Sequence, residues 1–264
     1  MFTDASLERL APFGFKAGKG GTHAARTMML PELRRLLEVT RGETDRTAYR
    51  AAVVEANALD KPTVKARKLT LSHLAQLYAL ADDICLFRAL RRLWDSDPAG
   101  QPVLALQLAL ARDTLLRASA AAVLDAKPGD PVTREGMESL LNDWSGGRLS
   151  PRSVKAIAQR VNGSWTQAGY LKGRVRKVRS VPTVTPANTA YALFQAWLTG
   201  RSGRRLYGSD WVRILGLPED RLVELTQSAA ERGILVFRRT GDVMEVRFPG
   251  YLTPAEEETR SEQA

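Results

Sequence analysis

The stretch LSPRSVKAIAQRVNGSWTQAGYLKGRVRKVR, residues 149–179, decides how the fold of this chain is interpreted. It holds eight basic residues and no acidic one, whereas the whole chain of 264 residues has a net charge of +10. The eight are Arg152, Lys155, Arg160, Lys172, Arg174, Arg176, Lys177 and Arg179. Because each phosphate that is neutralised releases condensed counterions, clustered charge of this kind indicates contact with a nucleic-acid backbone. The alternative is a solvated basic surface that leads into a flexible basic linker.

The same stretch has the pattern of two helices separated by a turn. Ser150 is suited to cap the first helix, and apolar residues at helical spacing follow it. The dipeptide Asn162-Gly163 predicts the end of this helix, and Ser164 predicts the start of a second. With a supporting helix at residues 133–144, the pattern predicts a basic helix-turn-helix over about residues 133–179. The side chains expected to face a groove are Lys155, Gln159, Arg160, Thr166 and Gln167.

The first 130 residues predict an all-helical bundle. Apolar residues at helical spacing favour helices at residues 22–39, 47–57, 72–95 and 103–124. Residues 103–124 are numerous enough to span a membrane, but Arg112, Asp113 and Arg117 at their middle favour a helix of a soluble bundle instead. The glycine-rich residues 13–22 lack the spacing of a phosphate-binding loop. A flexible arm that becomes ordered on a partner is the remaining functional interpretation of that segment.

Beyond an extended linker at residues 181–186, the pattern changes to that of a winged helix. Helices at residues 189–198, after Ser209, and at 218–232 precede two alternating strands around a Thr-Gly-Asp turn. The third helix carries more acidic than basic residues, which opposes its insertion into a DNA groove. The basic residues lie before the second helix and on the wing, and they include Arg204, Arg205, Arg238 and Arg239. DNA contact through these residues and docking of a protein partner are equal alternatives.

The prediction for the whole chain is therefore a mainly α fold with two domains. Residues 1–180 form a helical domain that contains the helix-turn-helix, residues 187–252 form the winged-helix domain with its small β-hairpin, and the acidic residues 253–264 are expected to be disordered. One cysteine excludes a disulfide framework, and two histidines with that cysteine do not suffice for a zinc site. No nucleophile motif is found. We expect a cytoplasmic protein that is not an enzyme, has no catalytic residue and needs no metal or cofactor.

Four stretches resemble the BrxA family, small accessory proteins of BREX bacteriophage-exclusion systems. They are FGFKAGKGGTHAARTMML from residue 13, KPTVKARKLTLSHLAQLYAL from residue 61, ARDTLLRAS from residue 111 and SPRSVKAIAQRVNGSWTQAGYLKG from residue 150. The resemblance implies an all-helical cytoplasmic protein with helix-turn-helix and winged-helix elements that binds DNA without catalysing a reaction. It also implies an operon shared with a methyltransferase, an ATPase and a phosphatase-like protein. The residues it supports as DNA contacts are Arg152, Lys155, Arg160, Thr166, Gln167 and Lys172.

Three hypotheses about function follow. The first is a non-enzymatic, mainly sequence-tolerant binder of double-stranded DNA that serves antiviral defence, with other proteins of the same system as further partners. The second is a transcriptional regulator that reads an operator as a dimer. The third is an adaptor whose winged helix docks a protein. The sequence predicts no membrane contact and does not indicate an oligomeric state.

Overall fold

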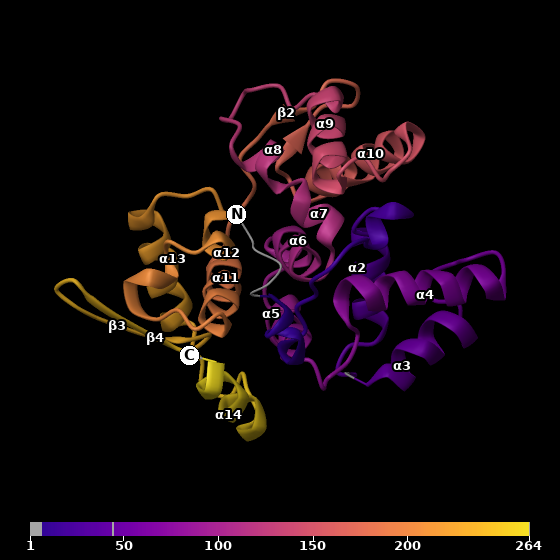
Figure 1. The fold of residues 1–264 in the computed structure, drawn as a ribbon. Coiled ribbons are helices and arrows are strands. Elements are labelled where there is room, and N and C mark those ends of the chain that lie inside the picture. Colours follow the sequence, from indigo (N-terminus) through magenta and orange to yellow (C-terminus); the bar gives the residue numbers. More distant parts are fainter. Residues whose placement is uncertain (1–6, 44, 264) are drawn as a thin grey trace.

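The chain folds into helices joined by short loops, with two small antiparallel hairpins (Figure 1). The computed structural model describes residues 7–43 and 45–263. The longer helices are α2 (Leu30–Val39), α4 (Val64–Tyr78), α5 (Cys85–Trp94), α6 (Gln101–Arg112), α9 (Arg134–Ser145), α10 (Pro151–Gln167), α11 (Pro186–Leu198), α13 (Glu219–Glu231) and α14 (Pro254–Gln263). The short ones are α3 (Arg46–Arg50), α7 (Thr114–Ala118), α8 (Ala120–Leu124) and α12 (Asp210–Arg213).

The two hairpins differ in length. The first pairs β1 (Leu171–Lys172) with β2 (Val178–Arg179), and the second pairs β3 (Val236–Thr240) with β4 (Val243–Arg247). Single turns of 3₁₀-helix occur at Ala11–Phe13, Thr22–Ala24 and Gly203–Leu206, and α3 continues as a π-helical turn, Ala51–Glu55. A mainly helical fold is therefore confirmed. Among the described residues, no helix has the length and apolarity needed to cross a membrane.

The predicted helix at residues 72–95 is wrong in its boundaries, because the chain breaks between α4 and α5. Ala79 and Leu80 adopt positive φ angles of 67° and 52°. The guanidinium of Arg112 donates hydrogen bonds to the carbonyl oxygens of Ala75 and Gln76 in the last turn of α4, at 3.5 and 3.2 Å. Carbonyls at a helix end need such partners, so a remote side chain stabilises the end of α4.

The predicted helix at residues 103–124 is also divided. The break falls at Asp113, which is 2% exposed and whose carboxylate accepts a hydrogen bond from the backbone N–H of Leu116, as a capping residue does. The same carboxylate accepts a backbone bond from His23 at 3.1 Å and lies 3.0 Å from the Nδ1 atom of His23. An acidic residue in the middle of an apolar run therefore caps α7 inside the protein.

The glycine-rich segment at residues 13–22 is tied to the core by its buried ends, while residues 18–21 are exposed, so it is not a free arm over its whole length. Phe13 and Phe15 are buried, and the backbone N–H of Lys16 donates to the carbonyl of Ala111 at 2.9 Å. Gly14 has a φ of 105°, and a Cβ atom there would overlap Ile84. The predicted helix at residues 22–39 is correspondingly shorter, since α2 begins only at Leu30.

Helix α11 joins the two halves of the protein, with both α5 and α6 on one side and α12 and α13 on the other (Figure 1). Gln107 of α6 is fully buried, and its side chain donates to the carbonyl of Asn188 at 2.9 Å, while its backbone carbonyl accepts from the side chain of Gln195 at 3.0 Å. The buried apolar residues form one continuous cluster from Leu7 to Leu252. The predicted helices at 189–198, after Ser209 and at 218–232, and the second hairpin, are confirmed as elements.

The prediction of a disordered tail at residues 253–264 is wrong over the described part. Residues 254–263 form α14, which is tied to two earlier helices. Arg260 lies over the ring of Trp197 at 3.6 Å from its centroid, and Glu256 forms an ion pair with Arg88. An acidic composition predicted disorder, but these two contacts hold the helix against α5 and α11.

Candidate nucleic-acid interface

The basic stretch folds differently from the predicted pair of helices. α10 runs without a break from Pro151 to Gln167, so the helix end predicted at Asn162-Gly163 is wrong. Gly163 instead allows close packing, because a Cβ atom there would lie 3.1 Å from the side chain of Thr27. The apolar stripe continues through Val161 and Trp165 into the core, and its burial outweighs the cost of about 1 kcal/mol for glycine inside a helix. The capping role of Ser150 is confirmed.

A basic hairpin follows α10 in place of the predicted second helix. Leu171 pairs with Arg179 and Lys172 with Val178. Residues 173–177, the hairpin tip, connect the two strands. Gly173 has a φ of 97°, and a Cβ atom there would overlap the carbonyl oxygen of Arg176. The tip therefore needs glycine at this position.

The hairpin is anchored on its other edge by residues 129–132. The backbone N–H of Val132 donates to the carbonyl of Lys177 at 2.9 Å, and the N–H of Arg179 donates to the carbonyl of Asp130 at 2.9 Å. This segment leads directly into α9, whose N-terminus is capped by Thr133. The start of α9, one face of α10 and the hairpin tip thus meet at one place.

Seven of the eleven contact residues predicted within residues 149–179 gather at this place. Arg152, Lys155 and Gln159 share one exposed face of α10, because residues three, four and seven positions apart lie on the same side of a helix. Lys172, Arg174, Arg176 and Lys177 come from the hairpin, and Lys177 donates to the carbonyl of Gly173 at 2.7 Å. Among the described carboxylates, none pairs with these six basic side chains. We refer to these seven residues as the basic surface.

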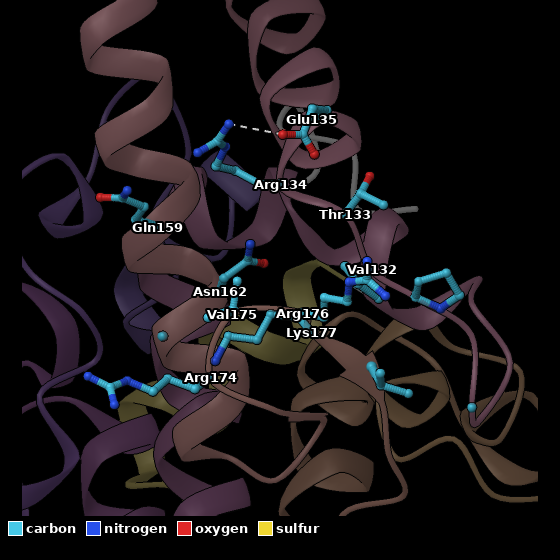
Figure 2. A pocket seen from close by; sticks show the side chains of 14 residues that line it. Val132, Thr133, Arg134, Glu135, Gln159, Asn162, Arg174, Val175, Arg176 and Lys177 are labelled. Atoms are coloured by element: carbon cyan, nitrogen blue, oxygen red, sulfur yellow. Dashed lines mark hydrogen bonds and ion pairs between the residues drawn. The ribbon is translucent and has the colours of Figure 1, made fainter.

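A cavity of about 870 Å³ opens between α9, α10 and the hairpin tip (Figure 2). Four cationic side chains and one carboxylate line it: Arg134, Arg174, Arg176, Lys177 and Glu135. Glu135 is neutralised by Arg134 at 3.0 Å. The pKa of Glu135 lies below its ordinary value, because the carboxylate accepts a hydrogen bond from its own backbone N–H and lies beside Arg134. The unopposed charge in the cavity is therefore positive.

Four other predicted residues do not belong to the basic surface. Arg179 is buried, donates to the carbonyl of Ser180 and lies 5.1 Å from the centroid of the Tyr170 ring, so its prediction as a DNA contact is wrong. Burial lowers the pKa of its guanidinium. Arg160 donates to the carbonyl of Ala24, Gln167 contacts the backbone of Leu30, and Thr166 donates to the carbonyl of Asn162. Arg160 and Gln167 thus hold α10 against residues 24–30, whereas the bond of Thr166 lies within α10.

The predicted basic residues of the C-terminal part form a separate group. Arg205, Arg238 and Arg239 are exposed, while Arg204 pairs with Glu219 of α13 at 2.7 Å. Figure 1 places the second hairpin and the first at different ends of the view, so the structure does not bring these arginines to the basic surface. A hollow of about 430 Å³ between α13 and the second hairpin is lined by four carboxylates and two arginines: Glu219, Asp220, Glu224, Asp242, Arg204 and Arg239. Its acidic lining is unfavourable for DNA.

Several residues that line the cavity were missed from the sequence, among them Arg134, Asn162 and Val175. Asn162 lines the cavity, although the sequence suggested a helix end there, and Val175 at the hairpin tip is 91% exposed. The spacing of Lys155, Gln159 and Asn162 places all three on one face of a continuous helix, and this signal was available in the sequence. Nothing in the sequence marked Val175.

A buried chain of polar side chains lies behind α10. The Nδ1 atom of His23 lies 3.0 Å from Asp113, and its Nε2 atom lies 2.8 Å from the Oγ atom of Ser164. This is the order of groups in a serine hydrolase. However, all three side chains are at most 2% exposed, and Ser164 also accepts a bond from the backbone of Met28. A substrate has no access to them, so they fasten residues 22–28 to α10.

Comparisons with known proteins give no relative for this chain. No known protein family, no curated protein and no solved structure matches it. Among the described residues, no three His, Cys, Asp or Glu side chains lie close enough together to hold a metal ion.

Proposed function

We propose that this protein is a non-enzymatic binder of double-stranded DNA that contacts the phosphate backbone through the basic surface. The observation that carries the proposal is the group of six basic side chains on α10 and the first hairpin that no described carboxylate neutralises. Surface cations of a protein in water are usually interspersed with carboxylates. A one-sided group instead favours a polyanion as the partner.

The shape of the surface also supports DNA as the partner. α10 presents Arg152, Lys155 and Gln159 along its first half, and the hairpin tip projects beside its second half (Figure 2). A helix or a two-stranded ribbon fits the major groove of DNA. We infer that α9 and α10 act as the helix pair of a DNA-binding unit. We also infer that α11, α12, α13 and the second hairpin form a winged helix. The role in phage defence rests on the resemblance to the BrxA family alone.

The test is the salt dependence of binding to random duplex DNA. For the wild type, the logarithm of the affinity is expected to fall steeply with the logarithm of the salt concentration. In the double variant Arg174→Ala/Arg176→Ala, we expect the affinity to fall on the order of tenfold and the slope to flatten by about two. Fluorescence anisotropy with labelled duplexes of unrelated sequence, at several salt concentrations, measures both quantities.

Two control variants locate the interface. Arg35→Ala/Arg41→Ala changes the net charge equally but removes exposed arginines that pair with Glu38 and Asp95. It is expected to leave affinity and slope unchanged. Arg238→Ala/Arg239→Ala removes cations from the second hairpin, and an equal loss of affinity there would show that the C-terminal group also contacts DNA. A flat salt response of the wild type contradicts the proposal.

Two other functions make different predictions. A transcriptional regulator is expected to be a dimer that prefers a palindromic site over random duplexes. An adaptor is expected to retain a protein partner after nuclease treatment and to bind no DNA directly. The ion pair between Arg204 and Glu219 favours the adaptor role, but only for the C-terminal part, because it reduces the positive charge that this part can offer to phosphate.

A further inference from the structure

We propose that the cavity between α9, α10 and the hairpin tip binds a nucleotide, with its phosphate on the hairpin tip and its base edge at Asn162. The ligand chemistry is a phosphate joined to a nucleobase. An unpaired nucleotide of a DNA strand supplies it, and in that form the inference rests on the proposed function. A free nucleotide has the same chemistry, and the experiment below separates the two sources.

The state of Asn162 is the first observation. Its side chain lines the cavity and points from α10 into the space between α9 and the hairpin (Figure 2). Asn162 is 6% exposed, and its Oδ1 atom has no hydrogen-bond partner among the described residues. Leaving a buried polar group unpaired costs about 1–3 kcal/mol, and such a group in a folded protein calls for an explanation. A ligand that pairs with the carboxamide provides one.

The cations around the cavity are the second observation. Arg174 and Arg176 line the cavity from the hairpin tip, and no described carboxylate pairs with either. The guanidinium of Arg174 points away from α9, so it would have to turn toward the cavity to contact a phosphate there (Figure 2). The twelve-residue helix α9 begins at the cavity wall, with Thr133 as its capping residue. One arginine guanidinium can donate two parallel hydrogen bonds to a phosphate group, and a helix N-terminus favours an anion. The phosphate therefore belongs between the hairpin tip and α9.

The remaining walls fit a base. Pro131, Val132, Val175 and Val178 form the apolar part of the lining. Gln159 also lines the cavity, but its carboxamide points away from that of Asn162 (Figure 2). Carboxamides of asparagine and glutamine form paired hydrogen bonds with base edges. A base taken out of its stack is held by such bonds and by apolar side chains against its faces. The volume of about 870 Å³ lies within the range of small-molecule sites and suffices for one nucleotide.

The experiment compares three ligands by fluorescence anisotropy and competition: a blunt duplex, the same duplex with one unpaired nucleotide, and a set of free deoxynucleoside monophosphates. We expect the duplex with the unpaired nucleotide to bind about tenfold more tightly than the blunt one, corresponding to one or two additional hydrogen bonds. If free monophosphates instead bind the protein and the two duplexes do not differ, the ligand is a free nucleotide.

The diagnostic variant is Asn162→Leu. Because the Oδ1 atom has no partner in the free protein, an apolar side chain of similar size is expected to leave the melting temperature unchanged or to raise it. The preference for the unpaired nucleotide, or the binding of free monophosphates, is expected to disappear. Asn162→Asp, which keeps the shape and adds a charge that repels phosphate, is expected to lose the preference as well. Asn142→Leu, at an exposed position of α9, is the matched control and is expected to behave as the wild type.

Failure of this inference differs from failure of the proposed function. If both duplexes bind equally, with the expected salt dependence, and free monophosphates do not bind, the cavity is no nucleotide site but DNA binding stands. A lowered melting temperature of Asn162→Leu with an unchanged preference assigns Asn162 a purely structural role and overturns the inference. If no duplex binds at any salt concentration, the proposed function fails. The cavity is then a nucleotide site only if free monophosphates bind.

Discussion

At the scale of single residues, the structure uses Asn162 and Gly163 in a way that their dipeptide did not suggest. Asn-Gly predicts a turn because both residues tolerate a left-handed backbone. In α10 both are helical, and Gly163 lies close to Thr27 while Asn162 faces the cavity. Local propensity gave the wrong answer because tertiary packing decides at this position, and a single sequence does not display that packing. The basic residues around it could be named from the sequence because charge is visible there directly, and their contact with DNA stays a prediction.

Asp113 is the residue whose replacement is expected to be most costly. Burial by itself raises the pKa of this carboxyl, but His23 and the backbone N–H groups of Leu116 and His23 outweigh burial and hold the pKa below its ordinary value. In Asp113→Asn we expect a loss of about 3 kcal/mol in the free energy of unfolding at neutral pH, because a buried charged partner is removed. Chemical denaturation measures it. Asp125→Asn, at an exposed helix end, is the control and is expected to change little.

The carboxyl of Asp113 also predicts how the free energy of unfolding depends on pH. A carboxyl whose pKa is lower in the folded state stabilises the fold fully above its unfolded pKa, about 3.9, and loses this effect as the pH falls through the folded value. The difference in stability between the wild type and Asp113→Asn is therefore expected to be constant above about pH 5 and to shrink below about pH 4. A difference that is independent of pH down to acid unfolding contradicts a lowered pKa of Asp113 in the folded protein.

At the scale of elements, the first hairpin was not predicted from the sequence because its strands are too short. Two residues in each strand give no periodic signal, so residues 171–179 resembled the end of a helix and a linker. The divisions at residues 79–84 and at Asp113 were missed for a different reason. Arg112 and His23 stabilise them from distant segments, and sequence spacing does not display such contacts. The second hairpin, with five residues in each strand and a Gly-Asp turn, was predicted correctly.

Gly173→Ala tests the geometry of the hairpin tip. The new Cβ atom would overlap the carbonyl of Arg176, and φ is 97°, so we expect the tip to change its conformation and DNA affinity to fall about tenfold. The free energy of unfolding is expected to change by less than about 2 kcal/mol, because the tip is exposed. Gly241→Ala is the matched control, with a φ of 58° and no neighbour within 4 Å. Equal effects of the two variants on affinity would rule out a special role of the first hairpin.

At the scale of the whole molecule, α11 packs against both halves of the protein. Its residues 187–196 are all buried, and Gln107, Asn188 and Gln195 link it to α6. We expect one unfolding transition, with coincident midpoints for far-ultraviolet circular dichroism and tryptophan fluorescence. Asn188→Ala leaves the N-cap Thr185 in place but removes the side chain that accepts from the Thr185 backbone N–H and donates to the carbonyl of Gly100, and it is expected to lower both midpoints together. Two separate transitions, of which the variant affects only one, contradict this expectation.

The continuity of α10 has a mechanical consequence. Seventeen helical residues form a rod about 26 Å long, and a rod without a hinge moves as a whole. Asn162 and Ser164 are about 200° apart around its axis, so one side lines the cavity while the opposite side rests on His23. If a ligand in the cavity tilts α10, the tilt also strains the hydrogen bonds of Ser164 with His23 and Met28 on the opposite side of the helix. Binding of a ligand in the cavity is therefore expected to affect how firmly residues 22–28 are held, because α10 transmits the movement.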